Sequence, residues 1–392
     1  MSQTLSLSRS EEIPALLERI DAITPLLKEA GAANEQHARL TDEVVAALHD
    51  SGVFRLTVPR ELGGYEASPL QTLEVLERLA YADGSTGWAV LAVGLVSGQT
   101  AALLAESGAR QLFGEDKYTV IAGQGTRPGT ARRVDGGYLL SGQWQFASGM
   151  HLSSHTHSGG LVEGTNEYLI FTVPREQAAF VDNWDVTGLR ATGSIDYRME
   201  EVFVPEDHTF SPVMAEPVTG GAVYLLGLPN TVTLIHQAWA LGMSRRLLEE
   251  MRAIAHKKSG TPQNSIDSAE YYAEYARAEA KYRAARALIR EFWTEAEETL
   301  SRGERLTEEQ EDSTILALNH VTAVMLEISG FVYKWAGTAA LRRGDLQRVI
   351  ADARAGAQHV TSSPQLLHSV GKRVAGFAPD TFWAFFQLVP KG

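Results

Sequence analysis

The chain has 392 residues, of which 44% are hydrophobic and 21% charged, a composition typical of globular proteins large enough for more than one structural unit. Its formal net charge is −13 and no run of lysine and arginine exceeds two residues, which argues against a nucleic-acid partner. The absence of cysteine excludes disulfides, thiolate nucleophiles, iron–sulfur clusters and cysteine-bound zinc. The first residues lack the basic and apolar regions of a secretory signal, so we expect a cytoplasmic protein.

The amino-terminal part has apolar residues at every third or fourth position, which predicts amphipathic helices. The first helix includes Ile13 to Leu27, Thr41 begins a second, and Pro69 begins a third. Residues 84–105 carry no charge over about the length of a membrane span. They nevertheless contain four glycines, two serines, two threonines and a glutamine, so we expect a buried helix and no membrane partner.

The pattern changes between residues 118 and 210 to short apolar or alternating runs, such as YTVIA, GYLLSGQW and EYLIFTV. Turn signals separate these runs, and Asp135-Gly136 between two of them is a hairpin signal. Several short strands at this spacing predict a small β-barrel or β-sandwich.

Helical spacing returns in the last part of the chain, in longer segments. We expect helices near 229–257, 266–302 and 307–342, and a shorter one around 346–370. Long helices with short connections predict an antiparallel four-helix bundle. The chain is therefore expected to be an α+β multidomain protein, with domains at 1–116 (helical), 117–212 (β) and 213–392 (helical bundle).

Two local motifs are candidates for a cofactor or metal site. Gly123, Gly125 and Gly129 loosely resemble G-x-G-x-x-G, but a hairpin pattern and not a helix follows them, so we expect no NAD(P)H-binding domain. His151, His155 and His157 have spacings that metals accept, but also suit packing or pocket-lining histidines. Nothing else in the chain supports a metal, and we expect none.

A longer string carries a family resemblance. Residues 184–205, WDVTGLRATGSIDYRMEEVFVP, resemble the "G-L/M-R-x-T-G-S-x-D … V-F-V-P" signature of the acyl-CoA dehydrogenase superfamily, which closes the middle β-domain. Residues 48–68 and 341–355 resemble the family's early helix–loop and the helix before its active site. The resemblance implies the helical, β and helical layout of that family.

The chain departs from the dehydrogenases at their catalytic base. His359 and Val360 occupy the Tyr-Glu positions of the family's "Y-E-G-T" turn, and no Asp or Glu occurs between Asp352 and Asp380. The chain instead resembles the flavin-dependent monooxygenase branch, through ADGSTGWAV (82–90), SGQWQFASG (141–149) and His359.

This resemblance implies the oxygenase component of a two-component monooxygenase. Such a protein takes reduced FAD, or FMN, from a separate NAD(P)H:flavin reductase. With O2 it forms a C4a-(hydro)peroxyflavin that hydroxylates or epoxidises a small aromatic substrate, here indole-like or phenolic. The alternatives are acyl-CoA dehydrogenase-type oxidation, N- or S-oxygenation by the same peroxyflavin, and a non-catalytic binding paralogue.

The resemblance also implies site residues. His359 and Ser148 are the expected catalytic residues, with a helix-surface role and a strand-end hydrogen bond as their respective alternatives. The expected flavin contacts are Gln124, Thr126, Trp144, Ser148, Lys257, Ser259, Gly337 and Thr338. The expected substrate pocket contains Trp88, His151 and Tyr224. In the family some flavin contacts come from a neighbouring subunit, which implies a homo-oligomer, usually a tetramer.

Overall fold

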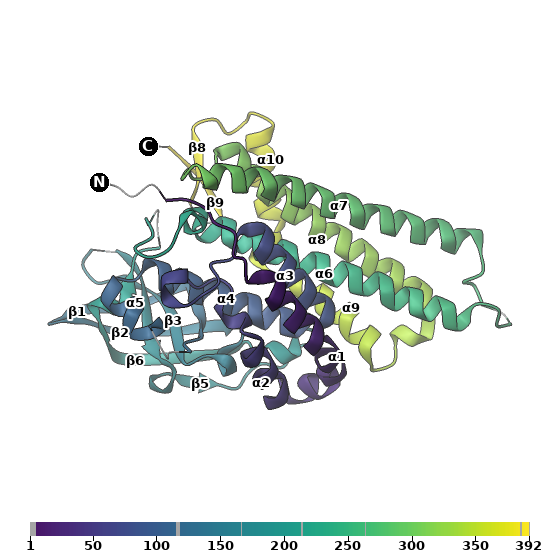
Figure 1. The fold of residues 1–392 in the computed structure, drawn as a ribbon, viewed down its shortest axis with the longest axis horizontal. Helices are drawn as coiled ribbons and strands as arrows, with labels where there is room; N and C mark the ends of the chain where they lie inside the picture. Colours follow the sequence, from purple (N-terminus) through teal and green to yellow (C-terminus); the bar gives the residue numbers. More distant parts are fainter. Residues whose placement is uncertain are drawn as a thin grey trace.

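The structure is a computed structural model and describes residues 5–114, 118–165, 167–212, 215–262, 264–384 and 386–391. Its elements follow one another as a group of helices, a group of strands and a second group of helices (Figure 1). This order confirms the predicted fold class. One hydrophobic core includes residues of all three groups, for example Leu16, Trp144 and Leu318.

The amino-terminal helices are α1 (Ile13–His37), α2 (Asp42–Ser51), α3 (Pro69–Ala82), α4 (Gly84–Leu103) and α5 (Glu106–Phe113). The short α5 was not predicted. Helix α4 packs against α3, α6 and β1. Two stretches, Gly84–Leu103 and Glu308–Ala340, have the length and apolar composition of a membrane span, and 78% and 56% of their most apolar windows are buried inside the fold. The prediction of a buried helix is thus confirmed for α4.

The strands are β1 (Ile121–Val134), β2 (Gly137–Ala147), β3 (His155–Val162), β4 (Tyr168–Pro174), β5 (Ala179–Val181), β6 (Ile195–Pro205) and β7 (Thr209–Phe210). They pair as one mixed sheet of seven strands, in the order β5-β6-β2-β1-β3-β4-β7, where we expected a closed barrel or two packed sheets. The β1–β2 hairpin at Asp135-Gly136 is confirmed, with Gly136 in the left-handed region (φ +74°). Strand β1 runs through Gly123, Gly125 and Gly129 with no helix after it, as expected.

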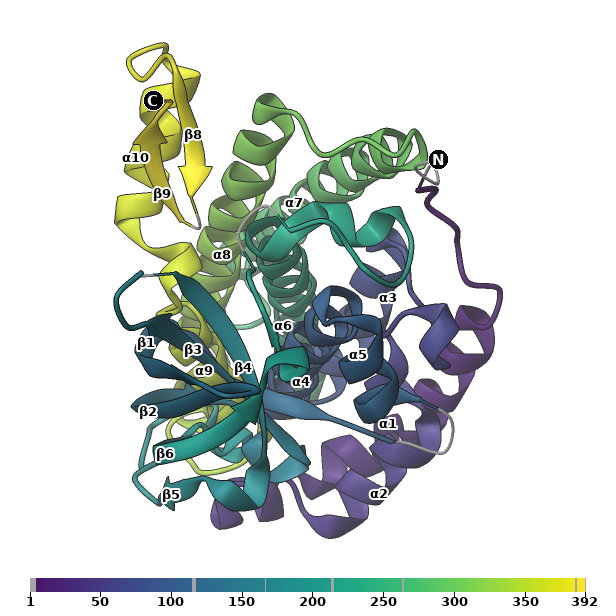
Figure 2. The same ribbon diagram turned by 90° about the vertical axis from the view of Figure 1, so that its left-hand side faces the viewer.

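The carboxyl-terminal helices are α6 (Gly227–Lys258), α7 (Ala269–Ser301), α8 (Glu308–Ala336), α9 (Asp345–Gly356) and α10 (Pro364–Val374). Helices α6, α7 and α8 run side by side (Figure 1). A short hairpin of β8 (Thr381–Ala384) and β9 (Gln387–Pro390) lies next to α10, away from the large sheet (Figure 2).

The single helix expected around 346–370 is the clearest error of the sequence prediction. The segment forms two helices, α9 and α10, separated by residues 357–363. Pro364 occupies the first turn of α10, and the residue before a proline disfavours the helical conformation, so one continuous helix cannot form. His359 lies in this break, with an extended backbone (φ −62°, ψ 145°).

Helices α4 and α6 form the seam on which the site is built. The indole nitrogen Nε1 of Trp239 in α6 donates to the carbonyl oxygen of Gly84 at the start of α4 (2.9 Å). Farther along, Trp88 of α4 contacts His236 of α6. Because the residue numbers run in opposite directions along this contact, the two helices are antiparallel.

Candidate active site

Three of the predicted site residues come together from three parts of the fold. Trp88 lies on α4, Ser148 follows β2, and His359 lies in the break between α9 and α10. Nε1 of Trp88 donates to Oγ of Ser148 (3.3 Å), and the Trp88 ring meets the His359 ring edge-on with centroids 5.7 Å apart. The sequence motifs thus identified residues that are neighbours in space.

A fourth residue of this cluster, His236, was missed. Its ring stacks on that of His359 with centroids 4.2 Å apart and an interplanar angle of 20°, and Trp88 contacts it edge-on. The available signal was an adjacent histidine and glutamine inside an apolar helical run, TVTLIHQAWALGM. Buried polar side chains in such a run need a reason, because they must be hydrogen-bonded or functional.

The backbone contacts of the two imidazoles assign their tautomers. Nδ1 of His236 lies 2.8 Å from the carbonyl oxygen of Val232, so it carries the proton and Nε2 is an acceptor. Nδ1 of His359 accepts from the backbone N–H of Thr361 (3.4 Å), so its proton is on Nε2. The stacked pair therefore offers one acceptor and one donor.

Both imidazoles are held neutral. Burial lowers the pKa of His236 to about 4. Burial, and then the neighbouring His236, lower the pKa of His359 well below its ordinary value. A neutral imidazole can take up a proton, whereas an imidazolium cannot.

Ser148 belongs to a chain of hydroxyl groups. Its Oγ lies 2.7 Å from Oγ of Ser194, which lies 2.7 Å from Oγ1 of Thr192. Thr192 donates its one hydroxyl proton to the carbonyl oxygen of Leu189 (2.7 Å). Each earlier hydroxyl must then donate along the chain, so Ser148 donates to Ser194 and keeps its own oxygen as an acceptor.

The turn that carries Ser148 has an unusual backbone. Phe146 has a positive φ of +60° and leaves 63% of its side chain exposed, with its ring edge toward Trp184. Gly149 has φ +73°, and a Cβ there would lie 2.7 Å from Cγ1 of Val93. Backbone strain next to an exposed aromatic ring is typical of functional turns.

The expected flavin contacts in the sheet differ in accessibility. Gln124 and Thr126 lie at the irregularity where β1 shifts its register against β3, and Oε1 of Gln124 accepts from the N–H of Thr126 (2.8 Å). Trp144 is fully buried, stacks on Tyr197, and donates from Nε1 to the carbonyl oxygen of Gly159 (3.0 Å). This geometry corrects the expectation for Trp144, whose ring belongs to the core.

The remaining expected flavin contacts lie at the far end of the bundle. Lys257 and Ser259 end α6 and Gly337 and Thr338 follow α8, and the two ends meet where Nζ of Lys258 donates to the carbonyl oxygen of Ala336 (2.8 Å). Along α6, Lys257 is about 30 Å from His236 at the rise of an α-helix. Within one chain, the predicted flavin contacts at the end of the bundle therefore lie far from the cluster of Trp88, His236 and His359.

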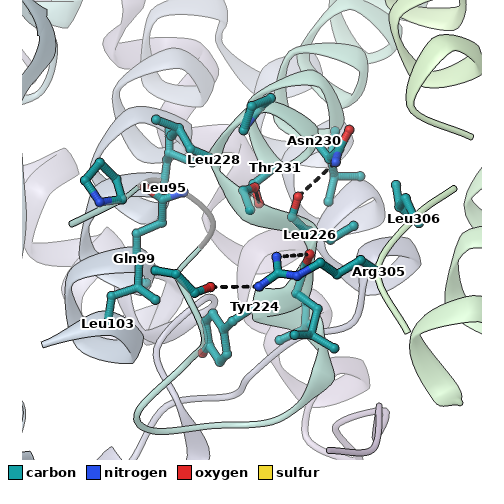
Figure 3. A pocket seen from close by; sticks show the side chains of 18 of the residues that line it. Leu95, Gln99, Leu103, Tyr224, Leu226, Leu228, Asn230, Thr231, Arg305 and Leu306 are labelled. Carbon is teal, nitrogen blue, oxygen red and sulfur yellow. Dashed lines mark hydrogen bonds between the residues drawn. The ribbon is translucent and has the colours of Figure 1, made fainter. Parts of the chain in front are cut away.

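The expected pocket residues do not all share one cavity. Tyr224 lines a cavity of about 370 Å³, shown in Figure 3, and its hydroxyl donates to the carbonyl oxygen of Thr57 (2.7 Å). His151 lies elsewhere: Nε2 accepts from the N–H of Leu40 (3.3 Å), and burial lowers its pKa to about 4. His151 is thus not among the residues that line this cavity.

The other histidines of that segment have separate partners. His157 is buried against Oγ1 of Thr100 (3.2 Å), and His155 is paired with Oγ of Ser154 (3.0 Å). The described residues contain no group of three side chains suited to hold a metal ion.

Comparisons with known proteins follow the same division of the chain. The family model described as "Acyl-CoA dehydrogenase, N-terminal domain" matches residues 21–111, and "Acyl-CoA dehydrogenase, C-terminal domain" matches residues 234–364. Together the two models cover more than half of the chain. The chain belongs to the acyl-CoA dehydrogenase family.

Within the acyl-CoA dehydrogenase family, the relatives are monooxygenases. The oxygenase subunit HsaA of a flavin-dependent monooxygenase from Rhodococcus jostii (strain RHA1) is 35% identical over 198 residues, which span 50% of this chain and about half (52%) of that protein. Indole-3-acetate monooxygenase of Pseudomonas putida is 29% identical over 88% of this chain and 90% of that protein. The predicted resemblance to the monooxygenase branch is confirmed.

A solved structure of a hydroxylase has the same fold as this chain. The crystal structure of 3-HSA hydroxylase from Rhodococcus sp. RHA1 superimposes with a TM-score of 0.88 at 26% identity, over 95% of this chain and 98% of that chain.

Proposed function

We propose that the protein is the oxygenase component of a two-component monooxygenase that uses reduced flavin and O2 to hydroxylate an aromatic substrate. The observation that carries this proposal is the cluster of Ser148, Trp88, His236 and His359. It contains a hydroxyl acceptor and two neutral imidazoles.

The competing function, acyl-CoA dehydrogenation, lacks its base. Val360, at the position of the dehydrogenase glutamate, is an exposed valine. Asp352, the nearest carboxyl in the sequence, is buried and accepts from the N–H of Leu189 (2.6 Å). Burial, together with Asp83, raises its pKa to about 8, so this carboxyl is mostly protonated at neutral pH.

The bound reduced flavin would supply the reaction with O2 at C4a and the transfer of one oxygen atom. Ser148 suits the flavin because its oxygen is directed as an acceptor, and N5 of a reduced flavin carries a hydrogen. Nε2 of His236 would take the proton of a phenol or an indole N–H, and the Nε2–H of His359 would donate a hydrogen bond to the substrate oxygen or nitrogen. Trp88 and Trp239 close the cluster with apolar surface, which limits the access of water.

We expect two partners, a flavin reductase and a second copy of the chain. With no NAD(P)H-binding motif, the protein would take reduced flavin from a separate reductase, and relatives named as oxygenase subunits support this. The adenosine half of FAD would reach the group of Lys257, Ser259, Gly337 and Thr338 only on a second copy of the chain. We therefore favour FAD over FMN and a homo-oligomer, such as a tetramer, in which two copies complete each site.

A stopped-flow experiment tests the proposal. The protein is mixed anaerobically with photoreduced FAD and then with oxygenated buffer, and the near-ultraviolet absorbance is followed. A long-lived oxygen adduct, followed by transfer of oxygen to an added phenol or indole, is expected. Immediate return to oxidised flavin, or bleaching of bound oxidised FAD by an acyl-CoA, contradicts the proposal.

A further inference from the structure

The cavity next to Tyr224 is larger and more apolar than a single aromatic ring requires. It lies between α4, the start of α6 and the β8 strand, and its volume of about 370 Å³ is within the range of ligand sites. Its apolar lining includes Leu95, Leu103, Leu226, Leu228, Leu234 and Leu306. Figure 3 shows Leu95, Gln99 and Leu103 of α4 on one side and Arg305 with residues of α6 on the other.

Helix α4 connects this cavity with the histidine cluster. Trp88, Ala92, Leu95 and Gln99 are spaced by four, three and four residues and so share one face of the helix. Leu95 lies about 10 Å from Trp88 at the rise of an α-helix. Ala92, between them, is half-buried although most of α4 is buried, so the side chain between the cluster and the cavity is small and partly accessible.

Nearly every polar side chain in the lining has its partner inside the protein. The side chains of Asn230 and Thr231 donate to backbone carbonyl oxygens one helical turn earlier, and Nε1 of Trp383 donates to Asp312. Gln99 differs: it is 8% exposed, and its Oε1 has no hydrogen-bond partner among the described residues. A buried acceptor without a partner is costly, which indicates a donor that arrives with a ligand.

The charges of the lining favour a neutral ligand. Its charged residues among those described are Arg305 and Glu311. The Arg305 guanidinium already donates to the carbonyl oxygens of Leu225 and Ala215 and to Glu216. Burial raises the pKa of Glu311, which disfavours the charged form of this carboxyl. The position next to Gln99 therefore suits a hydroxyl or N–H group and not an ion.

We propose, given the monooxygenase function above, that the substrate is an elongated aromatic compound. Its reacting ring lies at Trp88 and His359, an uncharged apolar extension fills the cavity along α4, and a hydroxyl or N–H group at the far end donates to Oε1 of Gln99. Gln99 is then a specificity-determining residue, and a bare phenol or indole occupies only part of the site.

Calorimetric titration of the full chain tests this proposal without turnover. The probes are phenol, 4-alkylphenols of increasing length, and the same 4-alkylphenols with a terminal hydroxyl. Affinity is expected to rise by up to about fourfold for each methylene that enters the cavity. At the length that reaches Gln99, the terminal hydroxyl adds about fivefold, the net effect of one hydrogen bond. An affinity independent of chain length overturns the proposal.

Two variants separate the parts of the site. Gln99→Leu is expected to remove the advantage of the terminal hydroxyl and to keep the dependence on chain length. Leu95→Phe is expected to abolish the dependence on chain length and to leave phenol affinity unchanged. Gln365→Leu, at an exposed position of α10, is the matched control and should alter neither.

The outcomes also distinguish this proposal from the proposed function. Binding of long phenols without hydroxylation would refute the monooxygenase function and leave the cavity assignment intact. Hydroxylation of phenol, with no effect of chain length or of Gln99→Leu on affinity, would support the monooxygenase function and overturn the cavity assignment. If Leu95→Phe weakens the binding of phenol and of every alkylphenol equally, the cavity is a route to the site. That result would overturn its role as a binding subsite.

Discussion

His236 and His359 stack with ring centroids 4.2 Å apart, although one lies in the middle of α6 and the other in the break after α9. Two imidazoles at this distance disfavour double protonation, because the second positive charge would be repelled in a buried setting. The pair therefore behaves as one unit that holds at most one extra proton. This suits a site that removes one proton from a substrate.

The first prediction concerns the reaction. His359→Ala should lower the hydroxylation rate by about 10²- to 10⁴-fold, the usual effect of removing a general acid–base group, with flavin binding retained. His236→Phe keeps a flat ring against His359 and removes Nε2. It should also lower the rate, because Nε2 of His236 is the proton acceptor of the pair. The rate of product formation and the product formed per reduced flavin consumed are the measurements, and unchanged values of both in His359→Ala would remove His359 from the mechanism.

The second prediction concerns stability against pH. The native state keeps His236 neutral down to a pKa of about 4, whereas the unfolded chain takes up that proton near pH 6.5. The unfolded state thus binds more protons between these values, and the free energy of unfolding falls as the pH drops from about 6.5 to 4. His236→Phe should remove up to about 3 kcal/mol of this loss.

Urea unfolding at pH 7, 6, 5 and 4 measures this effect. His320→Gln is the control, because it removes an exposed histidine on α8 that is not part of the stacked pair. If the free energy of unfolding of His236→Phe falls with pH as steeply as that of the wild type, the buried imidazole is not a source of acid sensitivity.

The third prediction concerns the packing under His359. A Cβ on Gly356 would collide with the Trp239 ring and lie 3.0 Å from Cζ3 of Trp88. Gly356→Ala should therefore destabilise the protein by about 1–3 kcal/mol and displace the Trp88–His359 contact. Gly371→Ala, in α10, meets no atom within 4 Å and should be neutral or stabilising. Thermal unfolding compares the two, and equal melting temperatures would contradict the packing argument.

The fourth prediction concerns the shared site. If a second copy supplies the adenosine contacts, Lys257→Glu and His359→Ala damage different halves of one site. Oligomers mixed from the two inactive variants should regain part of the activity, because some sites then receive an intact residue from each chain. Activity after mixing and subunit exchange is the readout. No recovery, with exchange verified by mass spectrometry, would place the whole flavin site within one chain.

Much of the site could be predicted because its residues stand in motifs. Ser148 and Trp88 lie in short strings next to turns or helix starts, and His359 occupies a position defined by the preceding helix. His236 stands in no such string, and a buried helical histidine most often only packs. Its role depends on a contact with a segment far away in the sequence, which periodicity does not reveal.

The errors have similar physical causes. Strand pairing between β1 and β3 is long-range and parallel, so alternation alone could not distinguish one mixed sheet from a barrel. The break before α10 did have a local signal in Pro364, but the apolar spacing on both sides favoured one helix. Trp144 and Gln99 show the same limit, since only the three-dimensional structure reveals which polar or aromatic side chains have partners.

The break between α9 and α10 is a place where members of this family can change a catalytic residue without changing the fold. Its side chains at His359 and Val360 project from a turn outside the helical hydrogen-bond ladders, and Val360 is exposed. Exchanging the exposed Val360 costs little folding stability, whereas an exchange inside α6 would disturb a packed core. A scaffold of this kind can pass from carboxylate to imidazole chemistry by altering one turn, while its helices remain as they were.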